Sequence, residues 1–128
     1  MWLGVMIGGA CGALARYAMT IGISKLLEGT ALSSFPLATL LINVLGSFLL
    51  ALIVYLNLAG TVPMFWRVAL GVGFLGAFTT FSTFSFDLEG MISQKQTGPA
   101  LLYGAGNVLL SLGATYAGKI SAVAWQGR

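Results

Sequence analysis

The chain has 128 residues, of which 58% are hydrophobic and only 7% are charged, and its mean hydropathy is +0.95. Too few polar side chains remain to cover a water-soluble domain, so the composition indicates an integral membrane protein. The net charge of +3 is scattered along the chain, which indicates no nucleic-acid partner. With no histidine and one cysteine, the sequence excludes a Ser-His-Asp triad, a His-ligated metal and an intrachain disulfide, so we do not expect an enzyme.

Four apolar runs follow one another along the chain. Each is long enough for a helix to cross a bilayer core of about 30 Å. Short breaks that carry Gly, Pro and charged residues separate the runs. We therefore predict an all-α integral membrane protein, a single domain over residues 1–128 with four transmembrane helices at residues 2–24, 35–58, 64–92 and 99–123.

The first run combines small residues with a permanent cation. A glycine stripe from Gly4 to Gly12, at spacings of three and four, allows another helix to approach closely. Arg16 lies in the same span, where a charge is costly unless it pairs or faces water. Its side chain either attracts an anion or reaches the headgroups or a carboxylate such as Asp87 or Glu89. The sequence leaves these two roles equally open.

The second and fourth runs carry polar residues one helical turn apart. These stripes are Thr39, Asn43 and Ser47 in the second run, and Asn107, Ser111 and Thr115 in the fourth. An Asn amide can join two helices or donate to a passing anion. A single stripe is more typical of interhelical hydrogen bonds, whereas several stripes in so small a bundle indicate a lined path.

The third run contains the stretch GAFTTFSTFSFD at residues 76–87. Its five hydroxyls compete for backbone hydrogen bonds and can replace those lost at a helix break, so we predict an interruption there. Carbonyl oxygens freed at such a break suit a small hard cation such as Na⁺. Phe81 and Phe84 project to one side of a helix, where their positive edges can face an anion, although packing alone also explains them.

The cations near the two ends of the predicted bundle are almost balanced. Lys25 and Lys95 belong to one side, and Arg67 and Arg128 to the other, with Lys119 nearby. Because an excess of Lys and Arg normally sets orientation, near balance allows insertion both ways. Two inverted copies could then pair as an antiparallel homodimer. The alternative is that a one-residue excess still decides a single orientation.

Three features together resemble the Fluc (CrcB-type) fluoride channels: an Arg in the first span, TLLIN in the second and GAFTTFSTFS in the third. The resemblance covers essentially the whole chain. It implies a passive, dual-topology antiparallel homodimer that exports fluoride through two pores in the bacterial inner membrane. It also implies a central Na⁺ held by backbone carbonyls of Gly76 and Thr79 from both subunits. The fluoride pathway that the resemblance implies contains Phe81, Phe84, Asn43, Ser82, Thr83, Ser111, Arg16 and Asn107.

Two other classes of membrane protein stay open on the sequence alone. A small four-span, proton-coupled cation or multidrug antiporter needs a membrane-embedded carboxylate. The first two spans contain none, so Asp87 and Glu89 in the third are its only candidates. A scaffold subunit without transport activity would explain the glycine stripe, but it would not explain the run of threonines and phenylalanines in the third span.

Overall fold

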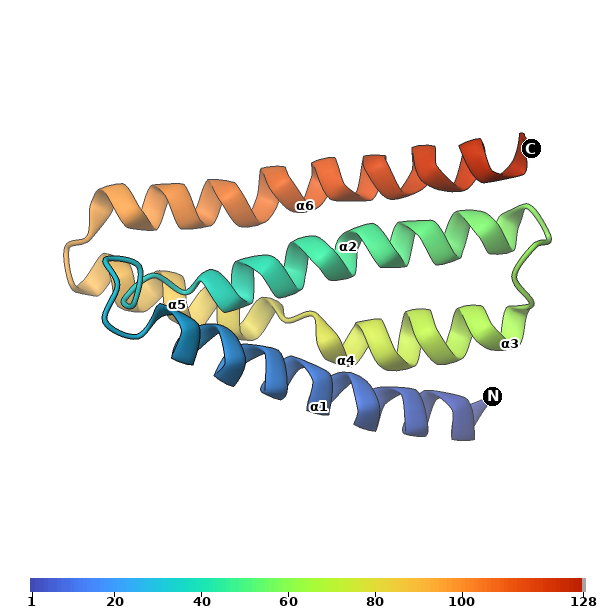
Figure 1. Ribbon diagram of the computed structural model, residues 1–128, viewed down its shortest axis with the longest axis horizontal. Helices are drawn as coiled ribbons and strands as arrows, with labels where there is room; N and C mark the ends of the chain where they lie inside the picture. Colours follow the sequence, from blue (N-terminus) through green and yellow to red (C-terminus); the bar gives the residue numbers. More distant parts are fainter. Residues whose placement is uncertain (128) are drawn as a thin grey trace.

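The computed structural model describes residues 1–127, and every regular element in this part of the chain is a helix (Figure 1). Four helical segments are long and apolar enough to cross a membrane, which supports a multi-pass membrane protein. They lie side by side along a common long axis. The elements are α1 (Trp2–Leu27), α2 (Leu37–Leu58), α3 (Met64–Trp66), the π-helical segment η1 (Arg67–Leu75), α4 (Gly76–Phe78), α5 (Phe81–Ser93) and α6 (Thr97–Gln126).

The helix ends differ from the predicted ends by up to three residues. Helix α1 continues three residues beyond residue 24, and α6 begins two residues before residue 99 and continues three beyond residue 123. Hydropathy locates the apolar part of a span, whereas helical hydrogen bonds continue into the polar boundary. Pro36 is the N-cap of α2, and Gly29 and Gly60 take positive φ angles of 76° and 75° in the turns after α1 and α2.

The third span consists of two helical parts. The first runs from Met64 to Phe78 through α3, η1 and α4, and the second is α5. Between them the backbone of Thr79 (ψ 157°) and Thr80 (φ −152°, ψ 120°) is extended. Figure 1 shows this connector as a short non-helical link between α4 and α5.

Glycines hold α1 directly against the first part of the third span. A Cβ added to Gly8 would collide with the carbonyl oxygen of Ala69, and one added to Gly12 would collide with that of Phe74. The close approach predicted from the glycine stripe is therefore confirmed. At Gly8 and Gly12 the nearest atoms belong to the backbone, so a side chain there could not be accommodated by rotation of a neighbouring side chain.

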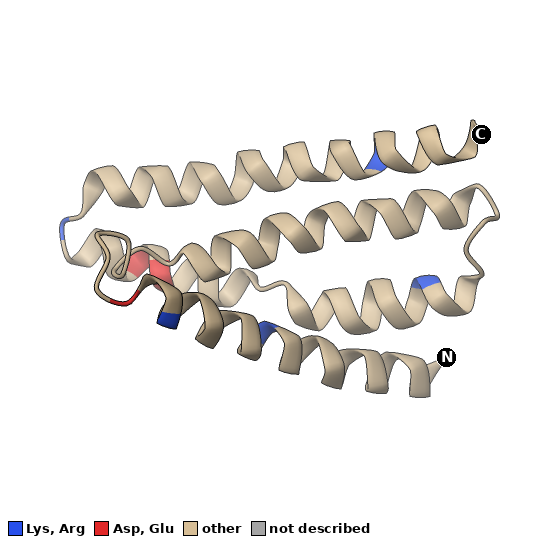
Figure 2. Cartoon of the chain, in the orientation of Figure 1, with Lys and Arg blue, Asp and Glu red and all other residues tan. Residues whose placement is uncertain are grey.

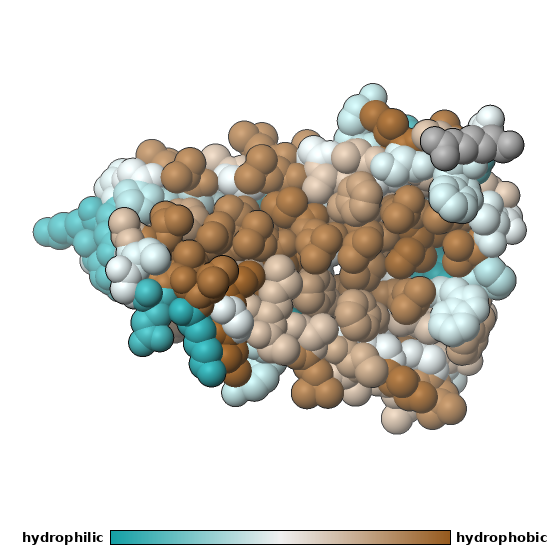
Figure 3. Space-filling view, in the orientation of Figure 1, coloured by the Kyte–Doolittle hydropathy of each residue, from teal (hydrophilic) through white to brown (hydrophobic). Residues whose placement is uncertain are grey.

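The two ends of the bundle differ in charge. All three acidic residues lie at one end, and the same end holds Lys25 and Lys95 (Figure 2). The cations described at the opposite end are Arg67 and Lys119, while Arg128 lies outside the described residues. The space-filling view shows hydrophilic residues gathered at the acidic end and a hydrophobic surface over the middle (Figure 3). This surface fits the hydrocarbon layer of a bilayer.

Candidate functional site

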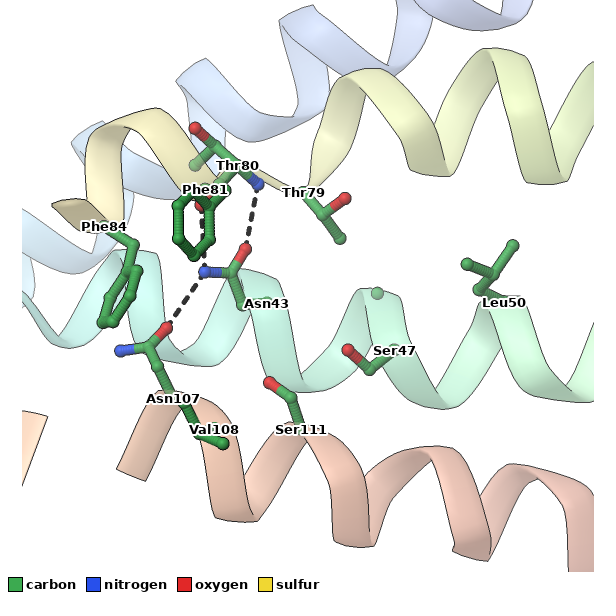
Figure 4. Close-up of a pocket in the computed structure, with 11 residues that line it drawn as sticks. Asn43, Ser47, Leu50, Thr79, Thr80, Phe81, Phe84, Asn107, Val108 and Ser111 are labelled. Carbon is green, nitrogen blue, oxygen red and sulfur yellow. Dashed lines mark hydrogen bonds between the residues drawn. The ribbon is translucent and has the colours of Figure 1, made fainter. Parts of the chain in front are cut away.

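Asn43 of α2 binds the extended connector of the third span. Its Oδ1 accepts a hydrogen bond from the Thr80 backbone N–H at 2.9 Å, and its Nδ2 donates to the Thr80 carbonyl oxygen at 3.1 Å (Figure 4). One amide side chain thus satisfies both backbone groups of a residue outside the helical ladder. Asn43 therefore fixes the position of the connector relative to α2.

The Thr80 side chain caps the helix that follows. Its Oγ1 accepts from the Thr83 backbone N–H at 3.2 Å and donates to the Thr83 hydroxyl at 3.0 Å, with the Ser82 hydroxyl 3.3 Å away. In a continuous α-helix, the N–H groups of Thr80 and Thr83 would bind the carbonyls of Gly76 and Thr79. Both donors bind elsewhere here, so these two carbonyls lose their helical partners. Thr80 was not predicted to have this role, because it is one of five hydroxyl residues between positions 79 and 85.

Asn43 also connects α2 to α6. Its Nδ2 donates to Asn107 Oδ1 at 2.9 Å, and Asn107 Nδ2 donates to the Tyr103 carbonyl oxygen at 3.1 Å. The Asn107 side chain is only 6% exposed, so it lies within the bundle. The polar stripes predicted on the second and fourth spans therefore meet, and a chain of amides joins the connector to α6.

A cavity of about 280 Å³ opens beside this amide chain (Figure 4). The rings of Phe81 and Phe84 lie 5.5 Å apart at its border, the first 78% exposed and the second 8% exposed. The Ser111 hydroxyl is buried and has no hydrogen-bond partner among the described residues, so it can still donate to a ligand. The cavity brings together six of the predicted site residues: Asn43, Thr79, Phe81, Phe84, Asn107 and Ser111.

Two other predicted residues line a separate cavity. Arg16 and Thr83 border a space of about 270 Å³ between α1, α2 and α5, and Thr80 borders both cavities. The Nε of Arg16 is buried and has no hydrogen-bond partner among residues 1–127. Ser82 and Gly76 line neither cavity, although the Ser82 hydroxyl is within hydrogen-bonding distance of Thr80.

The carboxylate of Asp87 joins three helices. Its Oδ2 accepts from the Thr39 hydroxyl of α2 and from the Tyr103 hydroxyl of α6, each at 3.1 Å. The Tyr103 ring is fully buried, and its centroid lies 5.4 Å from that of Phe84. Thr39 and Tyr103 each precede an asparagine of the amide chain by one turn, which is the only sequence signal that could have indicated this cluster.

The polar groups of the first cavity can donate hydrogen bonds to a small anion. Its polar lining consists of amide and hydroxyl groups, and no carboxylate belongs to it. Phenylalanine edges add weak positive ends without strong hydrogen bonds. Within residues 1–127, no group of three His, Cys, Asp or Glu side chains could hold a metal ion.

Comparison with known proteins gives consistent matches along the chain. Residues 3–119 match the family model described as CrcB-like protein, Camphor Resistance (CrcB). A Deinococcus radiodurans protein named "Fluoride-specific ion channel FluC" is 48% identical over 120 residues, which cover 94% of this chain and 93% of that protein. "Fluoride-specific ion channel FluC 1" of Leifsonia xyli is 45% identical, over 88% of this chain and 79% of its own length. A Thermus thermophilus protein with the first name is 41% identical, over 87% and 86% of the two chains.

Proposed function

The chain belongs to the CrcB-like family, and from this membership we infer that it is a fluoride-selective channel, a passive transporter rather than an enzyme. Relatives that bear the fluoride-channel name match nearly its whole length. The observation in the structure that carries the proposal is the first cavity, where free hydrogen-bond donors and aromatic edges meet without a carboxylate. We propose that it lets fluoride leave the cell across the bacterial inner membrane and so reduces fluoride toxicity.

Fluoride is strongly hydrated, so a selective pore must supply donors in place of its water. The free hydroxyl of Ser111 and the second N–H of Asn107 Nδ2 are placed to do this. Both N–H groups of Asn43 are already bound, so Asn43 contributes by holding Asn107 and the connector at the path. Phe81 and Phe84 hold the ion more weakly through their edges, which allows it to move on. On the other side of Thr80, Arg16 raises the electrostatic potential for an anion, and Thr83 continues the hydroxyl lining, with the Ser82 hydroxyl close to that of Thr80.

We propose that the interrupted third span also holds a structural Na⁺ through the carbonyl oxygens of Gly76 and Thr79. Support comes from the network around Thr80, which takes the helical donors away from these two carbonyls. Neutral oxygen ligands suit a hard monovalent cation. When bound, the ion would supply fixed positive charge beside the anion path. Two carbonyls are too few for one ion, so a second copy of the chain would complete the site.

An antiparallel homodimer supplies that second copy. The near balance of Lys and Arg between the two ends supports this proposal. The first cavity is also open at the surface of a single chain, where a second copy could cover it. A two-fold axis in the membrane plane would place both connectors at the midplane. Different copies of the chain would then insert in opposite orientations. Cysteine labelling from each side of intact cells tests this, and labelling from one side only would contradict it.

The decisive test is passive efflux from liposomes that contain the purified protein. One sample is read with a fluoride electrode and a matched sample with a chloride electrode. Rapid loss of fluoride with chloride retained is the expected result. Cation export that depends on a proton gradient would instead indicate the antiporter. For the sodium site, we expect a higher melting temperature in Na⁺ than in N-methylglucamine buffer.

A further inference from the structure

An open groove of about 560 Å³ lies between α2 and α6, away from the acidic end of the bundle. It is lined by Tyr55, Leu109, Leu112, Gly113, Thr115, Tyr116 and Lys119. Lys119 is exposed, and its Nζ lies 5.5 Å from the centroid of the Tyr55 ring. This cation–π contact keeps the ammonium group at the groove instead of letting it extend freely toward water.

One face of α6 leads from the groove toward the first cavity. Ser111, Thr115 and Lys119 follow one another at a spacing of four, so their side chains lie in succession along that face. Each step rises about 6 Å, which places Lys119 about 12 Å beyond Ser111 along the helix. Ser111 lines the cavity, Lys119 lines the groove, and Thr115 lies between them.

Within a single chain, the charge distribution leaves the Lys119 ammonium available to a mobile anion. All three carboxylates of the described residues lie at the opposite end of the bundle. The Lys119 charge is therefore not neutralised by a nearby acid within its own chain. Salt shortens the range over which this charge attracts an anion. The Debye length is about 30 Å at 0.01 M salt and about 3 Å at 1 M.

We propose that this groove is an outer capture site for small inorganic anions, in which Lys119 raises the local fluoride concentration before the ion reaches Ser111. The proposal rests on the channel function inferred above. The ammonium attracts the hydrated ion through its charge, and dehydration begins only at the donors of the cavity. Lys119 thus affects the rate of entry, whereas Asn43 and the phenylalanines affect passage.

The test compares fluoride efflux by the wild type and by Lys119→Gln, Lys119→Arg and Lys25→Gln in neutral phosphatidylcholine vesicles. Lys25 is an exposed lysine at the acidic end, so its replacement removes the same charge without touching the groove. At low fluoride and about 0.01 M salt, Lys119→Gln should slow efflux at least about threefold. The difference should shrink toward onefold in about 1 M of an impermeant salt, and Lys119→Arg and Lys25→Gln should match the wild type.

Each other outcome overturns the proposal in a recognisable way. An equal reduction at both salt concentrations would mean that Lys119 acts through packing. If the assay is repeated in vesicles that contain phosphatidylglycerol, a reduction seen only there would assign Lys119 to an anionic lipid headgroup. Unchanged efflux by Lys119→Gln, with a conducting wild type, would refute the capture site alone. A wild type that loses no fluoride would refute the channel function, and the capture site with it.

Discussion

The two parts of the third span are held in the bundle by different means. The part before the connector, Met64–Phe78, meets α1 through backbone atoms at glycines. The part after it, Phe81–Ser93, is joined to α2 and α6 through side-chain hydrogen bonds, and it presents Phe81 and Phe84 to the cavity. The glycine contacts of this backbone seam offer no side-chain group to a ligand, and they fix the position of the first part of the third span against α1. The side-chain network determines what the cavity can bind.

The largest expected effect comes from disrupting the backbone seam. In Gly12→Leu, the new side chain would collide with the backbone of Phe74, which cannot rotate away as a side chain could. We expect a loss of at least about 3 kcal/mol in folding free energy and almost no monodisperse protein. Size-exclusion chromatography of detergent-purified protein measures this.

Gly22→Leu is the matched control in the same helix. A Cβ at Gly22 meets nothing within 4 Å, so a leucine there should face lipid without displacing any element. Normal yield of the control and loss of Gly12→Leu would locate the effect at the seam. Equal yields of the two variants would show that α1 can separate from the third span without penalty.

The next largest effect comes from removing the amide that binds the connector. Asn43→Leu would leave the Thr80 N–H and carbonyl without partners and would break the bond to Asn107. Each unsatisfied group costs about 1–3 kcal/mol, and the connector and Asn107, which border the anion path, lose their shared support. We expect fluoride efflux to fall to the level of empty liposomes and the melting temperature to drop.

Asn57→Leu, near the other end of α2, provides the comparison. The Asn57 amide donates only to the Val62 carbonyl in the following loop, so its replacement should lower stability slightly and leave efflux unchanged. If both variants lost efflux equally, Asn43 would contribute no more than general helix stability.

Much of the difference between the glycine contacts of the first part of the third span and the polar contacts of the second part could be predicted from the sequence. The glycine spacing in the first span predicted close packing, because it depends only on local helical periodicity. The stripes around Asn43 and Asn107 were predicted for the same reason. The pairing of the two amides depends on how α2 and α6 rotate against each other, which no local pattern specifies.

The selection of Thr80 and the placement of Arg16 could not be predicted. The five hydroxyl residues between positions 79 and 85 have a similar local tendency to bind backbone groups, and only the approach of Asn43 distinguishes Thr80 from the others. From the sequence, the Arg16 side chain could either attract an anion or pair with a carboxylate. In the structure Asp87 binds Thr39 and Tyr103, while Arg16 lines a second cavity, and both facts depend on long-range packing.

A smaller effect is expected from changing the aromatic border of the cavity. Phe84→Ile removes the ring that faces both Phe81 and Tyr103. An aromatic edge contributes about 1 kcal/mol, so fluoride efflux should fall roughly fivefold if the ring contacts the ion. Phe86→Ile is the control, because Phe86 is 78% exposed on the same helix. Unchanged efflux from Phe84→Ile would mean that this ring only packs.

The smallest effect separates support of the ring from contact with the ion. Tyr103→Phe keeps the buried ring beside Phe84 but removes the hydroxyl that donates to Asp87, leaving that carboxylate with Thr39 alone. The lost bond should lower stability by about 1–2 kcal/mol, while efflux should fall no more than roughly twofold because Phe84 keeps its neighbour. Thermal unfolding and efflux are measured on the same preparation, and Tyr116→Phe, an exposed tyrosine of α6, is the control for the unfolding measurement. An efflux loss as large as that of Phe84→Ile would show that the Tyr103 hydroxyl itself belongs to the anion path, and the second part of the third span would then bind the ion over a greater length than the cavity alone.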